Sequence, residues 1–117
     1  MNVGNKISTL SISGLLLKGI KALILDVDGT LTTGKELFIS KDIKDWVLNS
    51  KKHFYLYLFS NNPSKKRIKL IAQKLGLEYS YSGSKPRKTK LKKVINTFPF
   101  NPSEIAIIGD RVFTDIL

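Results

Sequence analysis

Two aspartates lie two residues apart at the end of an apolar run, in the sequence Asp26-Val27-Asp28-Gly29-Thr30. Carboxylates with this spacing lie on one side of an extended chain, and the glycine lets the backbone turn without placing a side chain over them. Paired acids need a cation, and Mg²⁺ binds oxygen ligands while retaining several waters, so two or three carboxylates suffice. The pattern therefore predicts a magnesium site, and the alternative is a strand that ends in an Asx-type turn.

The elements that position these acids can be predicted from the spacing of apolar residues. Four runs are typical of buried strands: Lys21 to Val27, Phe54 to Phe59, Glu104 to Gly109 and, more weakly, Leu77 to Tyr81. Three groups between them have helical spacing: Ile43, Trp46 and Val47; Ile68, Ile71, Ala72 and Leu75; Leu91, Val94, Ile95 and Phe98. This alternation predicts an α/β fold with a parallel sheet, helices on both faces and a ligand site at the carboxyl ends of the strands.

Helix boundaries are marked by residues that favour them. Ser40 precedes the first predicted helix, Asn62-Pro63-Ser64 precede the second, and Gly76 follows the second. Pro99 and Pro102 bracket the end of the third. No repeat or low-complexity linker interrupts the sequence, so we expect one continuous domain over residues 1–117.

The balance of charge is strongly basic. The 117 residues include 20 Lys and Arg but only 9 Asp and Glu, a formal net charge of +11, and no cysteine. Disulfide frameworks, thiolate zinc sites and cysteine nucleophiles are thereby excluded. A basic surface attracts polyanions, so nucleic acid, an anionic membrane and phosphorylated substrates all remain candidate partners. Two basic clusters stand out: Lys65, Lys66, Arg67 and Lys69; and Arg87, Lys88, Lys90, Lys92 and Lys93.

The apolar segment from Leu10 to Ile20 is interrupted by Ser11, Ser13 and Lys18, and it is shorter than the ~20 residues of a membrane span. It also lacks a small-residue cleavage site of the kind that ends a signal peptide. We therefore expect no transmembrane helix, and a location in the cytoplasm or in an organelle interior such as a plastid or the mitochondrial matrix.

In the order of its short motifs, the sequence resembles the haloacid dehalogenase superfamily of phosphohydrolases. Asp26 to Thr30 matches the first signature, D-x-D-G-T. The resemblance implies that Asp26 is the nucleophile that becomes an aspartyl phosphate and that Asp28 is the general acid and base. Ser60 follows the strand as the second signature requires, and Thr30, Ser60 and the backbone N–H of Asn61 would hold the phosphoryl oxygens.

The last two signatures complete the implied site. Lys85, in Ser84-Lys85-Pro86, matches the third and would offset the charge of nucleophile and phosphate, with Lys88 as the alternative on spacing alone. The stretch from Gly109 to Asp115 matches the fourth, G-D-x-x-x-T-D. There Asp110 and Asp115 would join Asp26 and Asp28 around Mg²⁺. The resemblance thus implies a Rossmann-like fold and in-line phosphoryl transfer.

No cap insertion separates the signatures, so an open site is expected, suited to a large or membrane-bound substrate or to closure by oligomerisation. Among capless members the sequence is most similar to the YqeG type of subfamily IIIA, related to phosphatidylglycerophosphate phosphatases. It has Gly29 where that type usually has Asn, and it ends at Leu117 where the type continues. We therefore expect a sheet without its last strand.

Two alternatives remain open. The opening Asp26 to Thr32 followed by Gly34 also resembles sugar-phosphate phosphatases of the 3-deoxy-manno-octulosonate 8-phosphate type. A basic, non-catalytic module that binds nucleic acid or a membrane surface is the other, and a salt-dependent nucleic-acid shift without phosphatase activity would favour it. The tyrosines would then offer stacking surfaces, but their alternation predicts packing on the sheet: Tyr55, Tyr57, Tyr79 and Tyr81. His53, which precedes a strand, is predicted to be a surface residue.

Overall fold

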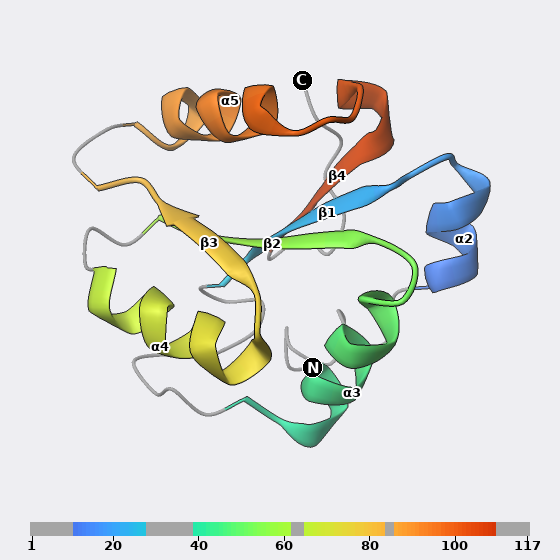
Figure 1. The fold of residues 1–117 in the computed structure, drawn as a ribbon, viewed down its shortest axis with the longest axis horizontal. Coiled ribbons are helices and arrows are strands. Elements are labelled where there is room, and N and C mark those ends of the chain that lie inside the picture. The colour runs from blue at the N-terminus through green and yellow to red at the C-terminus, as the bar shows by residue number, and fades with distance from the viewer. Residues whose placement is uncertain (1–10, 28–38, 62–64, 84–85, 110–117) are drawn as a thin grey trace.

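A computed structural model describes residues 11–27, 39–61, 65–83 and 86–109 of the chain. Helices and strands alternate in the described parts, as the sequence predicts (Figure 1). The elements are α2 (Ile12–Leu17), β1 (Ala22–Asp26), α3 (Lys41–Ser50), β2 (Tyr55–Ser60), α4 (Lys65–Leu75), β3 (Glu78–Tyr81), α5 (Arg87–Thr97), a 3-10 turn (Pro102–Glu104) and β4 (Ile105–Ile108). The predicted Rossmann-like α/β class is confirmed.

The four described strands form one parallel sheet in the order β3-β2-β1-β4. Helices α3 and α4 cover one face and α5 covers the other (Figure 1). The chain therefore runs outward from β1 through β2 to β3, and α5 then returns it to the other side of β1. The connections diverge between β1 and β4, which is where open α/β sheets bind their ligands.

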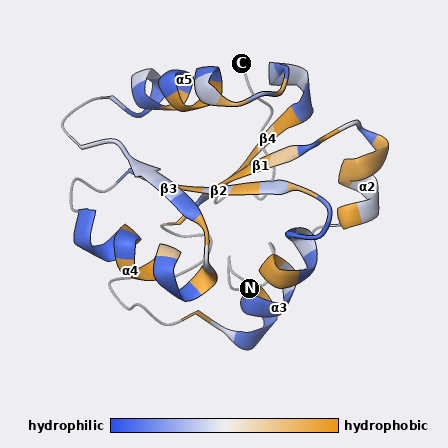
Figure 2. Cartoon of the chain, viewed as in Figure 1, coloured by the Kyte–Doolittle hydropathy of each residue, from blue (hydrophilic) through white to orange (hydrophobic). Residues whose placement is uncertain are grey.

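Each face of the sheet has its own apolar core, because successive side chains of a strand point to opposite faces. Leu23 and Leu25 of β1 pack with the buried residues of α3 and α4, whereas Ala22 and Ile24 pack with those of α5. All four are fully buried. Figure 2 shows the apolar strands β1 and β4 between α5 on one side and α3 and α4 on the other, whose outer faces are largely hydrophilic. Burial on both faces explains why β1 reads as a continuous apolar run.

Two of the predicted helix boundaries are confirmed by their hydrogen bonds. The hydroxyl of Ser40 accepts a hydrogen bond from the backbone N–H of Ile43 and so caps α3. Gly76 ends α4 with a left-handed φ of 67°, and the Nζ atom of Lys51 donates to its carbonyl at 3.4 Å. The predicted start of α4 at residues 62–64 lies outside the described residues.

Helix α2 is an element that the sequence did not predict, because six residues are too few to show a helical period. Ser11 caps it by accepting a hydrogen bond from the N–H of Gly14 at 3.0 Å. Leu15 is buried against the sheet, while Leu17 is 89% exposed. Figure 1 places α2 beside the amino end of β1. None of the helices that the structure describes has the length and apolar character needed to cross a membrane.

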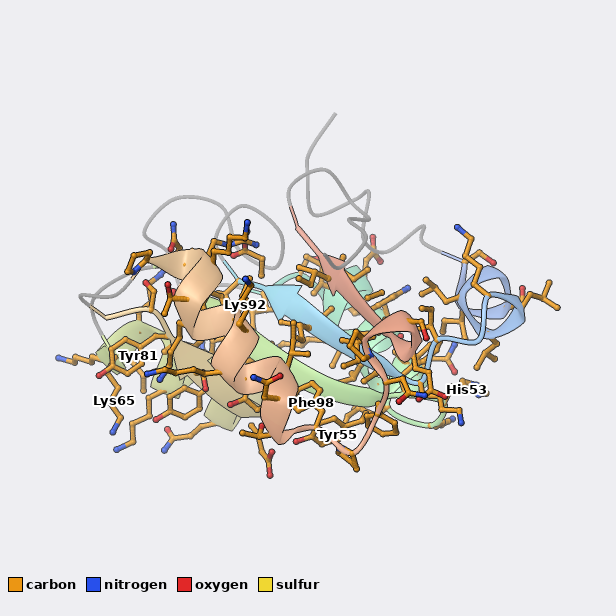
Figure 3. All side chains as sticks on the ribbon, turned by 90° about the horizontal axis from the view of Figure 1, so that it is seen from above. His53, Tyr55, Lys65, Tyr81, Lys92 and Phe98 are labelled. Atoms are coloured by element: carbon orange, nitrogen blue, oxygen red, sulfur yellow. The ribbon has the colours of Figure 1, made fainter. Side chains whose placement is uncertain are left out.

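The tyrosines of β2 pack on the α5 side of the sheet, as their alternation predicts. Phe98 lies edge-on to both Tyr55 and Tyr57, and its ring centroid is 5.1 Å from that of Tyr55 and 5.2 Å from that of Tyr57. Figure 3 shows Phe98 next to Tyr55. The hydroxyl of Tyr55 donates a hydrogen bond to Glu78 of β3. His53 is exposed in the turn before β2, as predicted. These tyrosines therefore hold α5 on the sheet and do not form a stacking surface.

Truncation within the core should cost far more stability than truncation on the surface. Ile71 of α4 is fully buried, and Ile71→Ala should lower the free energy of unfolding by about 2–5 kcal/mol, since it removes packed apolar volume. Leu48 of α3 is 59% exposed, and Leu48→Ala should change it by less than about 0.5 kcal/mol. Urea denaturation of both variants tests this, and equal losses would contradict the assignment of these faces.

Tyr55 should ionise only at a pH well above the usual range for a tyrosine. Burial, together with the hydrogen bond to Glu78, raises its pKa to about 12. The neutral phenol is thus favoured in the folded protein, and its stabilising contribution is lost as the pH rises from about 10 through 12. Tyrosinate absorbance during an alkaline titration should show this step in the native protein and lack it in Tyr55→Phe.

Candidate active site

Asp26 is the last residue of the central strand β1, at the carboxyl edge of the sheet. In register it lies beside Phe59, whose carbonyl accepts a hydrogen bond from the N–H of Val27 at 3.0 Å. Strand alternation places the carboxylate on the α5 side, and only 17% of the side chain is exposed. The predicted nucleophile therefore has a firmly held backbone and a mostly desolvated carboxylate.

A guanidinium group lies against this carboxylate. The Nη2 atom of Arg87 is 3.4 Å from the Oδ2 atom of Asp26, and 41% of the Arg87 side chain is exposed. The sequence predicts Arg87 only as a member of a basic cluster, and this contact was not predicted. One feature of the sequence indicates where Arg87 lies. Pro86, a residue suited to a helix start, precedes Arg87, so Arg87 begins a helix that follows the carboxyl end of a strand.

Ser60 and Asn61 lie at the end of the neighbouring strand. Ser60 is the last residue of β2 and is 2% exposed, whereas Asn61 is exposed. Ser82, which follows β3, donates through its N–H to the carbonyl of Ser60 at 3.0 Å and through its hydroxyl to that of Asn61 at 3.1 Å. The backbone that would hold phosphoryl oxygens is thus anchored to β3.

The structure brings Asp26, Ser60 and Asn61 to one edge of the sheet. Five predicted site residues lie outside the described residues: Asp28, Thr30, Lys85, Asp110 and Asp115. Their roles stay predictions. Gly109, directly before Asp110 in sequence, follows β4, and β4 pairs with β1. The fourth signature therefore begins at the same edge of the sheet as Asp26.

Helices α4 and α5 both begin at this edge of the sheet (Figure 1). Their first residues bring positive charge to it. Lys65 and Lys66 begin α4, Arg87 and Lys88 begin α5, and neither first turn contains an acid. The positive end of the helix dipole disfavours cations there, each by about 0.3–1 kcal/mol at low ionic strength. The arrangement costs stability, and it produces a positive field at the carboxyl edge that an anion would relieve.

The described residues include no group of three or more His, Cys, Asp or Glu that could hold a metal ion. At the carboxyl end of β1 they supply the carboxylate of Asp26, whose Oδ1 atom is buried. A buried anionic oxygen at the carboxyl edge belongs to the ligand class that Mg²⁺ prefers. The chemistry of this donor therefore fits the predicted ion.

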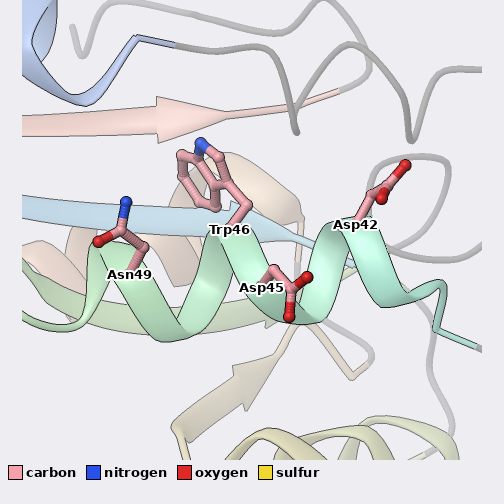
Figure 4. A pocket seen from close by; sticks show the side chains of 4 residues that line it. All are labelled: Asp42, Asp45, Trp46 and Asn49. Atoms are coloured by element: carbon pink, nitrogen blue, oxygen red, sulfur yellow. The ribbon is translucent and has the colours of Figure 1, made fainter.

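A shallow depression of about 440 Å³ lies elsewhere, on α3 (Figure 4). Asp42, Asp45, Trp46 and Asn49 line it. Its lining includes neither Asp26 nor Ser60, and Asp45 is engaged by Lys41 at 2.9 Å. This depression is separate from the residues that the sequence predicts to do chemistry.

The fold and the position of Asp26 place this chain in the class of Rossmann-like α/β proteins that have an aspartate at the carboxyl end of a central parallel strand. More particularly, residues 5–117 match the model of a family described as mitochondrial PGP phosphatase, and the chain belongs to that family. The predicted membership in a haloacid dehalogenase-type phosphatase family is thus confirmed.

Two relatives extend the comparison. The chain is 24% identical over 100 residues to the probable phosphatase YqeG of Bacillus subtilis (strain 168). The matched region covers 86% of this chain and 58% of YqeG. A hypothetical protein from Xanthomonas campestris has a crystal structure similar to this fold, with a TM-score of 0.55 and 15% identity. That match covers 87% of this chain and 61% of the other. The chain thus spans about three fifths of each relative.

The Ser82 hydroxyl should stabilise the protein through its hydrogen bond to Asn61. Ser82 is 5% exposed, so Ser82→Ala should lower the free energy of unfolding by about 0.5–1.5 kcal/mol, the usual net value of such a bond. Urea denaturation measures the change. Ser103→Ala, at an exposed residue, is the matched control and should leave stability unchanged; equal effects would show that the Ser82 bond contributes nothing.

Proposed function

We propose that the chain is a phosphomonoester hydrolase that acts through an aspartyl phosphate on Asp26. One observation carries this proposal: a largely buried aspartate ends the central parallel strand, beside the point where the connections diverge, with a guanidinium 3.4 Å from its carboxylate. A nucleophilic carboxylate and a cation at that edge are what transfer of a phosphoryl group requires. Membership in a phosphatase family supports the same reaction.

In the proposed reaction, a carboxylate oxygen of Asp26 attacks phosphorus in line and the bond to the ester oxygen breaks. Asp28 gives its proton to the leaving oxygen. Asp28 then accepts a proton from water, which attacks the phosphorus of the aspartyl phosphate, releasing inorganic phosphate and restoring Asp26. Ser60, Asn61, Thr30 and Lys85 are proposed to bind the phosphoryl oxygens.

We expect Mg²⁺ as the cofactor, held by Asp26, Asp28, Asp110 and Asp115. When bound, it would offset the negative charge of the phosphoryl group and the carboxylates. The carboxylate of Asp26 and the family membership support this assignment. The rest of the chemistry belongs to the side chains: attack by Asp26, proton transfer by Asp28 and retention of the phosphoryl oxygens by donors at the carboxyl edge.

The proposed substrate is phosphatidylglycerophosphate or a similar large or membrane-bound phosphomonoester. The family description and the positive starts of α4 and α5 support it, because such a substrate carries a second anionic group near its phosphomonoester. The exposed Leu16 and Leu17 lie at the other end of the sheet, so the basic residues that begin α4 and α5 are the described groups suited to an anionic membrane around the site. A mitochondrial location is proposed on the family description.

Phosphate release from phosphatidylglycerophosphate in vesicles tests the proposal. With Mg²⁺ the wild type should release phosphate, EDTA should abolish release, and Asp26→Asn should reduce it to background because the amide is not a nucleophile. Sugar phosphates under the same conditions rank the alternative substrates. Circular dichroism should show that Asp26→Asn keeps the fold.

Lys92→Ala is the matched control, since Lys92 is an exposed lysine of α5 (Figure 3), and it should retain activity. Full activity in Asp26→Asn would contradict the nucleophilic role. A folded wild type that releases no phosphate from any of these substrates, but binds nucleic acid in a salt-dependent manner, would favour the non-catalytic alternative.

A further inference from the structure

Arg87 contacts the predicted nucleophile but has no role in the predicted reaction. It lies two residues after the predicted phosphate-binding Lys85, at the start of α5, where the helix dipole disfavours a positive charge. Its guanidinium is held 3.4 Å from Asp26, across 61 positions of sequence. A contact this distant in sequence depends on the packing of α5 against the same face of the sheet as the carboxylate.

The geometry brings Arg87 within reach of anything that Asp26 attacks. A phosphorus atom in position for attack lies about 3–3.5 Å from the carboxylate oxygen. If the Oδ2 atom attacks, that phosphorus lies within about 7 Å of the Nη2 atom of Arg87, and its outer oxygens lie closer on some sides. With 41% of its side chain exposed, Arg87 can move over this span by rotating its own bonds.

The guanidinium of Arg87 has two possible partners, the carboxylate of Asp26 and a phosphoryl group, and its chemistry favours the phosphoryl group. The contact to Asp26 is long, at 3.4 Å through one nitrogen, compared with about 2.7–2.9 Å for a strong charge-assisted hydrogen bond. A phosphate dianion carries twice the charge of a carboxylate, and its oxygens match the planar fork of arginine in a bidentate arrangement. Arg87 is therefore better matched to a phosphoryl group than to the partner that it has in this structure.

We propose that Arg87 binds the phosphoryl oxygens of the substrate and of the phosphate product, and that its ion pair with Asp26 is the substrate-free arrangement of the same group. This inference rests on the proposed function, because it places the phosphate at Asp26. Arg87 thus adds a cation from α5 to those predicted from the sequence.

Inorganic phosphate is the probe, with wild type, Arg87→Ala and Arg87→Lys compared in the presence of Mg²⁺. Arg87→Ala should raise both the inhibition constant for phosphate and KM by about 10- to 100-fold, the range for loss of a charged hydrogen bond. Arg87→Lys should restore part of the affinity, since it keeps the charge but loses the fork. Lys92→Ala, which removes a charge from the same helix, should remain within about twofold of the wild type.

Binding of phosphate by isothermal titration calorimetry provides the second readout, and it needs no turnover. An unchanged phosphate affinity in folded Arg87→Ala overturns the inference, as does a lowered melting temperature without a change in affinity, which would show a purely structural role. If the wild type has no phosphatase activity, the proposed function fails, and the calorimetric titration still decides the inference. Loss of binding in Arg87→Ala then supports it, and equal binding or no binding in the wild type overturns it.

Discussion

The burial of β1 on both faces and its pairing along both edges constrain everything else in this protein. Its side chains from Ala22 to Leu25 contact one core or the other, so its interior has no room for a polar group. Asp26 is the first position at which a carboxylate can lie at the surface of the sheet. The candidate site lies at the carboxyl edge because Asp26 is the first residue of β1 whose side chain is not fully buried in an apolar core.

The second consequence of this architecture is electrostatic. In a parallel sheet each helix that follows a strand begins at the carboxyl edge, so the positive ends of the helix dipoles gather around the site. In this protein α4 and α5 also begin with lysine and arginine, which adds formal charge to the dipoles. These residues lower the stability of both helices there, and the resulting positive field favours an anion such as the proposed phosphoryl group.

The arrangement of α5 connects the fold to the site in a further way. Tyr55, Tyr57 and Phe98 pack α5 against the sheet near its last turn, while its first residue contacts Asp26. Aromatic packing thus holds the carboxyl end of α5 on the sheet, and the amino end of α5 lies beside Asp26. The predicted helix was recognised from Leu91 and Val94, but periodicity describes only its buried face. The helical period therefore does not indicate where Arg87, the exposed first residue of α5, would lie.

Much of the fold and part of the site follow from local features of the sequence. The strands were predictable because two-sided burial demands apolar runs, and Asp26 was predictable at the end of one because acids terminate such runs. Ser60 and Asn61 were predicted through the resemblance to the haloacid dehalogenase superfamily. Strand order was not predictable, since β4 lies beside β1 only after α5 crosses the opposite face. The contact between Arg87 and Asp26 was not predictable either, because it joins residues 61 positions apart through tertiary packing. Local pattern determined which residues end each element, and long-range packing decided which of those ends meet.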